Sequence, residues 1–223
     1  MPAISVSKKG IVTGSSFNNQ ADARDDDSGT HLDATGNENN SIQWFRSTAR
    51  GGGTMRYIRT FFYFDTSSVT GTVSSGEVQI ASGYTQTSAD VIGVKSTAFG
   101  GDGGTDLADD DFNNVDFSTA YTTVNTSWST SANALTLTST ALTDMKNNDY
   151  FIIALVEYDS DYLDSDTSNG AFTAGIAFGS AIRLNYTLAS TGYSHEVNGV
   201  AAANIGKVKG VATASIGKVI GVD

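Results

Sequence analysis

Aspartate-rich loops are the segments of this sequence whose residue types best suit a metal ion. Asp159, Asp161, Asp164 and Asp166 follow one another closely, directly after an apolar stretch. Calcium binds six to eight oxygen ligands in flexible geometry, which such loops supply. The sequence predicts no cofactor, and calcium held by these four carboxylates is the one alternative. Two further acidic runs are weaker candidates, and neither fits an EF-hand loop: Asp25–Asp27 and Asp109–Asp111.

Aromatic side chains in polar surroundings could stack on sugars. Tyr162 lies within the same aspartate-rich loop, and Trp128 is flanked by Ser and Thr. We therefore predict Tyr162 and Trp128 as a glycan-binding pair, with packing in the core as the alternative for each. Three other aromatic residues are further candidates with the same alternative: Trp44, Tyr84 and Tyr121.

Acid–base catalysis has few candidate residues in this chain. Glu157 lies inside an apolar segment, where it would either face a sheet edge or pair with Arg59 or Arg183. The two histidines, His31 and His195, are expected at the surface or in structural hydrogen bonds. The nucleophile motif GxSxG does not occur. The sequence thus predicts no catalytic residue, and a hydrolase that uses Glu157 remains the alternative.

The last 27 residues repeat with a period of 11. VNGVAAANIGK (Val197–Lys207) is followed by VKGVATASIGK (Val208–Lys218) and by a partial third copy, VIGVD. Self-similar units offer the same surface repeatedly, which favours assembly over catalysis. The predicted assembly residues are the apolar and turn positions of the repeat: Val197, Gly199, Val200, Ile205, Val208, Gly210, Val211, Ile216, Val219, Gly221 and Val222.

The conformation of this repeat has two interpretations. Eleven residues match three helical turns and would align the Val and Ile side chains in one stripe. Five glycines oppose a helix, since each costs about 1 kcal/mol relative to Ala, and β-branched residues prefer strands. Short extended segments that turn at glycine are therefore favoured. Such a strip buries little surface by itself, so we expect it to contact other copies of the chain.

Composition narrows the functional classes. The net charge of −11 disfavours sequence-independent binding to nucleic acid, which needs a basic surface. The absence of Cys excludes disulfides, and no apolar run is long enough for a membrane helix. Residues 1–14 lack the apolar core of a secretory signal, so we expect folding in a cytoplasm. Only four of the 24 acidic residues are Glu, and this excess of Asp indicates many loops between strands.

The apolar patterns predict short strands and one helical turn. In Arg56–Phe64, Ile58, Thr60, Phe62 and Phe64 share one face, with Arg59, Phe61 and Tyr63 on the other. This strand should therefore be central and covered on both faces, or have one face at a subunit contact. The nearly continuous apolar run Tyr150–Tyr158 predicts a central strand. The other expected strands are Ser41–Ser47, Glu77–Ile80, Asp90–Lys95, Tyr121–Val124, Ala134–Thr138, Phe172–Phe178 and Ile182–Leu188, with a helical turn at Ala141–Lys146 capped by Ser139 or Thr140.

These elements predict an all-β fold, an antiparallel sandwich of the jelly-roll type. Three parts are expected along the chain. Residues 1–40 form an N-terminal, loop-rich arm, residues 41–192 form the sandwich, and residues 193–223 form the C-terminal assembly strip.

Three segments resemble parts of a known group of β-sandwich proteins. RYIRTFFYFDTSSVTGTVSSGEVQIA (Arg56–Ala81) resembles the arginine–aromatic–FDTS pattern of DNRLRE-type domains, which occur in bacterial surface proteins and in virion proteins of tailed bacteriophages. DYFIIALVEYDSDYLDSDTSNG (Asp149–Gly170) and AIRLNYTLA (Ala181–Ala189) resemble the closing strands of the phage members. The terminal Gly-Lys-Val repeat is similar to C-terminal repeats of phage structural proteins.

The resemblance implies a structural role in a virion rather than catalysis. The chain would be an exterior appendage, either a capsid decoration or a head or tail fibre, and would contact itself, other virion proteins and a host surface glycan. The fibre-like appendages of such particles favour a homotrimer. The alternative is a carbohydrate-binding module of a cell-surface protein. The missing signal, and the missing proline after FDTS, favour the phage interpretation.

Overall fold

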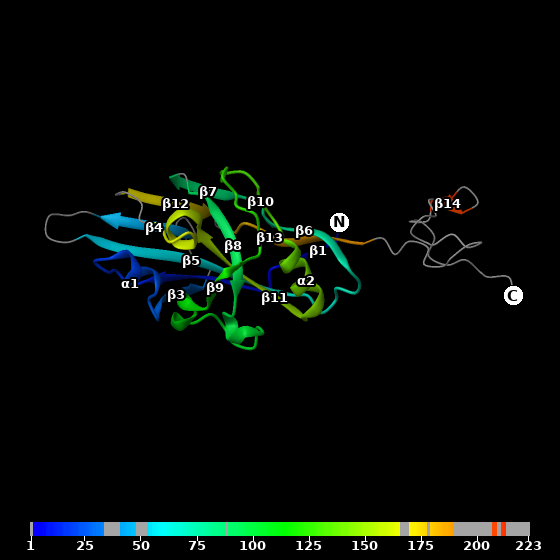
Figure 1. Cartoon of the computed structure of the whole chain (residues 1–223), viewed down its shortest axis with the longest axis horizontal. Helices are drawn as coiled ribbons and strands as arrows, with labels where there is room; N and C mark the ends of the chain where they lie inside the picture. Colours follow the sequence, from blue (N-terminus) through cyan, green and yellow to red (C-terminus); the bar gives the residue numbers. More distant parts are fainter. Residues whose placement is uncertain are drawn as a thin grey trace. The chain divides into compact units, whose positions relative to one another are not determined.

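The computed structural model describes residues 2–33, 41–47, 53–87, 89–165, 170–177 and 179–189, and two short strands at 207–208 and 211–212. It contains two compact units, Met1–Thr187 and Leu188–Asp223. In the first unit, two antiparallel sheets enclose a core, which confirms the predicted all-β sandwich (Figure 1). None of its described helices is long and apolar enough to cross a membrane.

The smaller sheet has four strands in the order β1-β13-β6-β10. Every pairing given for it is antiparallel, with Ile4 opposite Leu184 and Leu135 opposite Val78. Its strands have these bounds: β1 Ala3–Ser5, β6 Val73–Ile80, β10 Asn133–Thr136 and β13 Ile182–Leu188.

The larger sheet has nine strands, and β5 (Thr54–Asp65) is its axis. Because Thr60–Tyr63 pair with both β2 and β11, those two strands lie on opposite edges of β5. The first half of β5 pairs with β4, which continues to β12 and β7. The remaining strands are β2 Lys8–Gly14, β3 Gly29–Asp33, β4 Ile42–Ser47, β7 Gly83–Thr87, β8 Val91–Ser96, β9 Val115–Ala120, β11 Tyr150–Glu157 and β12 Gly170–Ile176.

The larger sheet is buried on both faces, as the aromatic pattern of Arg56–Phe64 predicts. Phe62 and Phe64 of β5 point into the core between the two sheets. Phe61 and Tyr57 point into a second core, which is covered by loops and by α1 (Gln20–Arg24). The strand β11 alternates in the same way and lies between β5 and β8, which confirms its predicted central position.

The loop between β8 and β9 forms much of the cover over the second core. It contains two short 3₁₀ turns, η1 (Phe99–Gly101) and η2 (Asp109–Asn113). Phe99, Leu107 and Phe112 of this loop are buried against the sheet. A π-helical turn, η3 (Tyr158–Tyr162), follows β11 and adds to the same cover. The sequence therefore encodes a third layer built from polar, glycine-rich segments with a few apolar anchors.

The predicted N-terminal arm at residues 1–40 is wrong, because its described residues belong to the sandwich. β2 is a full strand of the larger sheet, and Val12 is completely buried. The segment looked loop-like because residues 15–40 are polar and rich in Asp, Asn and Gly. At Gly14 a side chain is sterically excluded, since its Cβ would lie 2.7 Å from the Phe112 ring.

Two further local expectations change. Tyr121–Val124 was expected as a strand, but β9 ends at Ala120, and Tyr121 turns into the core. The helical turn is the longer α2 (Ser139–Asn147), and its N-cap is Thr138, whose hydroxyl accepts from the Ala141 N–H. The expected C-terminal boundary at residue 193 lies outside the described residues.

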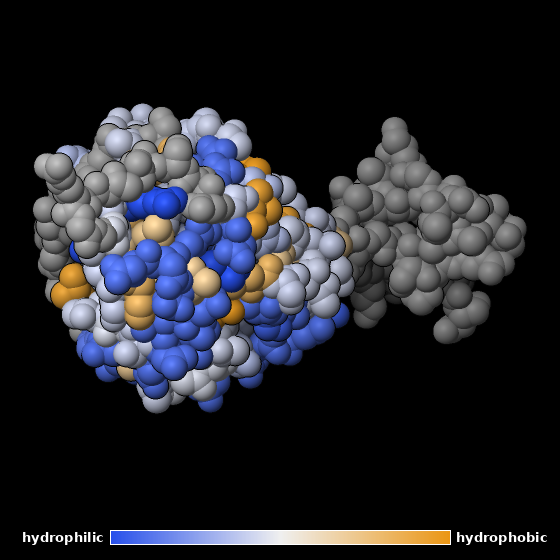
Figure 2. Space-filling view, turned by 60° about the vertical axis from the view of Figure 1, so that its left-hand side comes forward, coloured by the Kyte–Doolittle hydropathy of each residue, from blue (hydrophilic) through white to orange (hydrophobic). Residues whose placement is uncertain are grey.

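One face of the first unit carries mostly polar side chains (Figure 2). On the face seen in Figure 2, the hydrophobic residues form small separate patches among hydrophilic ones. Four large hydrophobic side chains are clearly exposed among the described residues: Leu32, Tyr84, Leu163 and Leu188. This face is therefore suited to water rather than to a broad apolar contact.

Candidate functional site: a buried arginine–aspartate clamp

The centre of the candidate site is Arg59, whose side chain is fully buried on the loop-covered face of β5. Its guanidinium binds the carboxylate of Asp161 through two hydrogen bonds. Nε donates to Oδ2 at 2.9 Å and Nη2 donates to Oδ1 at 2.7 Å. Asp161 is 1% exposed, so water does not reach the ion pair. Such bidentate pairs combine charge with a fixed geometry.

Two further donors of Arg59 bind backbone carbonyl groups of two covering segments. Nη1 donates to the carbonyl of Phe112 at 2.8 Å, and Nη2 donates to the carbonyl of Arg24 at 2.8 Å. The guanidinium carbon also lies 4.1 Å from the centre of the Phe112 ring and 5.0 Å from that of Phe117. One side chain of β5 thus holds α1, η2 and η3 together, and we call this set of contacts the Arg59 clamp.

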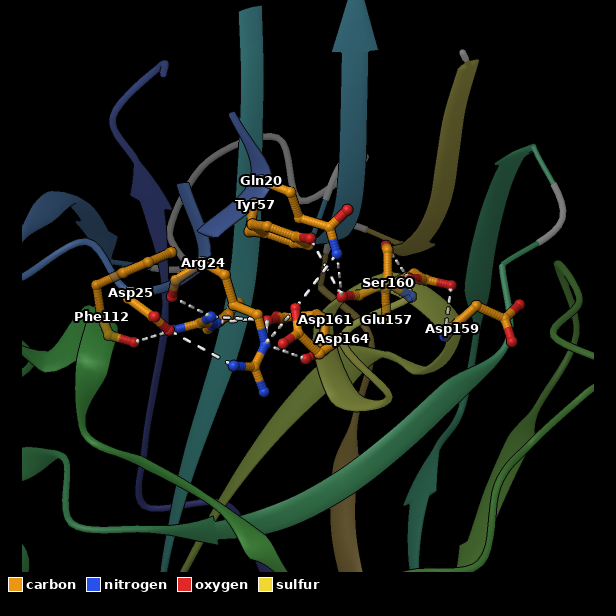
Figure 3. Close-up of polar contacts among 11 residues, drawn as sticks. Gln20, Arg24, Asp25, Tyr57, Phe112, Glu157, Asp159, Ser160, Asp161 and Asp164 are labelled. Atoms are coloured by element: carbon orange, nitrogen blue, oxygen red, sulfur yellow. Dashed lines mark hydrogen bonds and ion pairs between the residues drawn. The ribbon is translucent and has the colours of Figure 1, made fainter. Parts of the chain in front are cut away.

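The π-helical turn that carries Asp161 is itself fixed by Glu157. The Glu157 carboxylate accepts the backbone N–H of Asp159 at 3.0 Å and that of Ser160 at 2.7 Å, and it also accepts the Ser160 hydroxyl (Figure 3). Burial raises the pKa of Glu157 above its usual value, and these hydrogen bonds oppose that rise. Glu157 is therefore a helix cap. The expected pairing with Arg59 is wrong, because Asp161 occupies that position.

Two further side chains tie this turn to the sheet and to α1. The hydroxyl of Tyr57 donates to the carbonyl of Ser160 at 3.1 Å, and burial raises the pKa of Tyr57. Arg24 Nε donates to the carbonyl of Asp161 at 2.7 Å, and its guanidinium stacks 4.1 Å from the centre of the Phe117 ring. Figure 3 shows Arg24 and Gln20 reaching this turn from one side.

The chemistry of the clamp is structural. A guanidinium stays protonated at all relevant pH values and cannot act as an acid or base. Four of the five N–H donors of Arg59 are used, and both oxygens of Asp161 are engaged. The arrangement therefore fixes loops and leaves these two groups engaged with each other rather than facing a substrate.

The predicted calcium ligands do not converge. Asp161 points inward to Arg59, whereas Asp159 and Asp164 are exposed, and Asp159 lies on the far side of the turn from the other two (Figure 3). Across the described part of the chain, no group of three acidic or histidine side chains could hold a metal ion. The predicted set is thus wrong for these three residues, because a buried arginine claims the central carboxylate. Asp166 lies outside the described residues.

The two predicted glycan-binding residues differ in outcome. Trp128 belongs to the core between the two sheets and is only 8% exposed. Its Nε1 donates to the carbonyl of Gly175 at 2.9 Å. The prediction that Trp128 is a sugar platform is therefore wrong, because its side chain is buried in the core. Tyr162 is partly exposed and stacks on Tyr158, with ring centres 5.7 Å apart and planes inclined by 16°. Its role in binding stays a prediction.

Two of the predicted assembly positions, Val208 and Val211, lie among the described residues of the second unit. Val208 of β14 (Lys207–Val208) pairs with Val211 of β15 (Val211–Ala212) in an antiparallel ladder. These four residues are extended, as the glycine content predicts. The other assembly positions lie outside the described residues: Val197, Gly199, Val200, Ile205, Gly210, Ile216, Val219, Gly221 and Val222.

A second polar cluster joins α2 to the sheet. Lys95 of β8 lies 2.8 Å from Asp144 of α2, and the Tyr121 hydroxyl donates to the same carboxylate oxygen. Burial works to raise the pKa of Asp144, but the hydrogen bonds from Lys95 and Tyr121 outweigh it and lower that pKa. Burial and the bond to Asp144 raise the pKa of Tyr121. We call this set the Lys95 cluster.

The histidines agree with a structural role where they are described. The ring of His31 lies 2.6 Å from Asp109, and the backbone N–H of His31 donates to the same oxygen. His195 lies outside the described residues.

Sequence reasoning missed the partner of Arg59. Arg59 was expected on the same face as Phe61 and Tyr63, and an arginine on an aromatic, buried face requires a carboxylate partner. That requirement was visible in the sequence, but the choice among many aspartates was not. Comparison with known proteins adds nothing here, since no family model and no curated protein matches the chain.

Proposed function

We propose that this protein is a non-catalytic structural component of a tailed bacteriophage particle, displayed on the exterior as a capsid decoration or a head or tail fibre. The support is the resemblance of Arg56–Ala81 and Asp149–Gly170 to virion proteins. Those two segments contain most of β5 and all of β11, which pair side by side, and they supply the two members of the Arg59–Asp161 pair.

The observation that carries the proposal is how the buried charged side chains of these two segments are bound. Their buried charged side chains make internal contacts, since Arg59 binds Asp161 and Glu157 caps a turn. A domain whose polar groups fix long loops suits a part that must keep its shape on a particle surface. The hydrophilic outer face in Figure 2 agrees with exposure to solvent.

The repeat would supply the contact between copies. Antiparallel pairing at Val208 and Val211 gives a hairpin with a two-residue connection, and so short a hairpin is not stable alone. We therefore propose that the strip at 193–223 assembles with the strips of other copies, with a trimer as the expected state, and joins the domain to other virion proteins.

Mass spectrometry of purified particles tests the proposal directly. We expect peptides of this chain at a constant ratio to the major capsid protein. A variant without residues 193–223 should keep a folded sandwich but lose its oligomeric state in light scattering, or its place in particles. Absence of the chain from particles would refute the virion role, and unchanged stoichiometry of the truncated chain would refute the role of the strip.

A second candidate function is carbohydrate binding at a cell surface, by a phage adhesin or by a bacterial surface module. The partly exposed Tyr158–Tyr162 stack favours it, because an aromatic face is the usual platform for a sugar ring. Glycan-array binding that disappears in Tyr162→Ala, with Leu32→Ala as a control at an exposed apolar position, would support it. Arrays without any signal above background would argue against it.

A further inference from the structure

One wing of the larger sheet is free of acidic residues in a strongly acidic chain. Residues 41–64 contain four arginines, Arg46, Arg50, Arg56 and Arg59, and neither Asp nor Glu, although the chain carries a net charge of −11. This stretch supplies β4 and nearly all of β5. The next strands outward, β12 (GAFTAGI) and β7 (GYTQT), carry no charge at all. We call β7, β12, β4 and the first half of β5 the cationic wing.

Arg56 is the member of the cationic wing best placed to meet a partner. It is partly exposed on β5, directly opposite Phe45 of β4, and its guanidinium lies 5.3 Å from the centre of the Phe45 ring. Its Nε is buried and has no hydrogen-bond partner within the described part of the chain, so a partner would be met by the terminal Nη groups of this partly exposed side chain. Arg59 on the same strand differs, because it is fully buried and four of its five donors are used internally. An arginine held over an aromatic ring retains donors for an incoming carboxylate.

The complementary charge lies in the loop between β8 and β9. Residues 97–116 contain six Asp and neither Lys nor Arg. Asp102, Asp106, Asp109 and Asp110 are exposed, and Lys8 and His31 lie against Asp106 and Asp109. The carboxylate of Asp111, in contrast, is buried and accepts bonds within the loop. We call residues 97–116 the acidic loop.

These two surfaces lie on different sides of the sandwich. In Figure 1 the strands β4, β7 and β12 occupy the upper side of the first unit, whereas the green loop that leads to β9 lies below it. One copy therefore does not neutralise its own cationic wing with its own acidic loop. Two copies can do so, since the acidic loop of one can reach the wing of another.

We infer that the cationic wing of one copy binds the acidic loop of a second copy of this chain, in a head-to-tail contact centred on Arg56 and Asp110. The inference rests on the proposed assembly function, which brings many copies close together, but uses a surface distinct from the terminal repeat. A head-to-tail contact joins two different patches, so it extends into a ring or a row rather than closing as a symmetric dimer. Its charges would set orientation and salt dependence more than total affinity.

A charge exchange tests the contact on the full-length chain. Sedimentation velocity is measured over a concentration series at about 0.02 M and about 0.5 M salt, where screening differs strongly. The variants are Arg56→Glu, Asp110→Lys and an equimolar mixture of the two proteins. Lys146→Glu, an exposed position on α2 outside the wing, makes the same charge change as Arg56→Glu and serves as the control. Thermal unfolding confirms that each variant folds.

We expect each single variant to weaken the low-salt association constant roughly tenfold or more, because like charges then face each other across the contact. The mixture should recover it, since the altered wing of one protein now meets the altered loop of the other. High salt should reduce the wild-type association, and Lys146→Glu should leave it unchanged.

An equal low-salt association constant for Arg56→Glu and the wild type would refute the proposed contact. The same loss in Lys146→Glu would also overturn it, since net charge would then be the cause. Binding of the wing to heparin without any effect on self-association would instead assign it to a foreign anionic polymer. Particles that contain the chain while Arg56→Glu associates normally would refute this contact and leave the proposed virion role intact.

Discussion

The Arg59 clamp and the Lys95 cluster join covering elements to the same sheet through an ion pair, yet water reaches them very differently. The side chains of Arg59 and Asp161 are 0% and 1% exposed, whereas those of Lys95 and Asp144 are 40% and 23% exposed. A buried charge without its partner is far more costly than an exposed one. The clamp should therefore be necessary for the fold, while the Lys95 cluster should merely add to its stability.

Loss of Arg59 should have the largest effect on stability. In Arg59→Met the buried Asp161 carboxylate loses its partner, so we expect the free energy of unfolding to fall by about 3–5 kcal/mol. Urea denaturation measures this change, and Arg183→Met, at an exposed position on β13, should change it by less than about 0.5 kcal/mol. The double variant Arg59→Met with Asp161→Leu should recover part of the loss, because no buried charge remains. A single variant as stable as the control would show that the clamp is not needed.

Loss of Lys95 should have a clearly smaller effect. Solvent solvates the Asp144 carboxylate in Lys95→Met, and the Tyr121 hydroxyl still donates to it, so we expect a loss of about 1 kcal/mol or less. The coupling energy from a double-mutant cycle with Asp144→Asn should likewise be smaller than that between Arg59 and Asp161. Equal coupling energies for the two pairs would contradict the role assigned to burial.

The pH dependence of stability should have opposite signs in the two regions. The folded-state pKa of Glu157 is raised, so this group lowers stability as pH rises from about 4.5 through its folded pKa. The pKa of Asp144 is lowered, so its contribution is present above about 3.8 and is lost as pH falls through its folded pKa. Urea denaturation across this pH range measures the free energy of unfolding. Its decrease with rising pH should be lost in Glu157→Gln, and its decrease with falling pH should be lost in Asp144→Asn. Unchanged profiles in both variants would refute these assignments.

The smallest effect is expected at the exposed pair of His31 and Asp109. Both side chains are exposed, so His31→Gln should change the free energy of unfolding by less than about 0.5 kcal/mol at neutral pH. A thermal melt against the wild type, with Arg183→Met as reference, measures it. A loss as large as that in Lys95→Met would mean that this pair anchors the acidic loop more strongly than its exposure indicates.

Several features of this protein followed from the sequence alone. The alternation in Arg56–Phe64 and the apolar run in Tyr150–Tyr158 identified the two central strands, because side chains in a strand alternate between its faces. Ile182–Leu188 was predicted with its observed bounds. Glycine and β-branched residues indicated extended backbone in the repeat, which holds at Lys207–Val208 and Val211–Ala212.

Other features were decided only by the tertiary structure. β2 was missed because its burial comes from pairing with β5 and from Phe112 above Gly14, contacts between residues far apart in the chain. Trp128 is a core residue for the same reason. Above all, the sequence required a carboxylate for Arg59 but offered 24 acidic residues. Asp161 was selected because the π-helical turn capped by Glu157 aims that one side chain at the guanidinium, and only folding brings the two segments within hydrogen-bond distance.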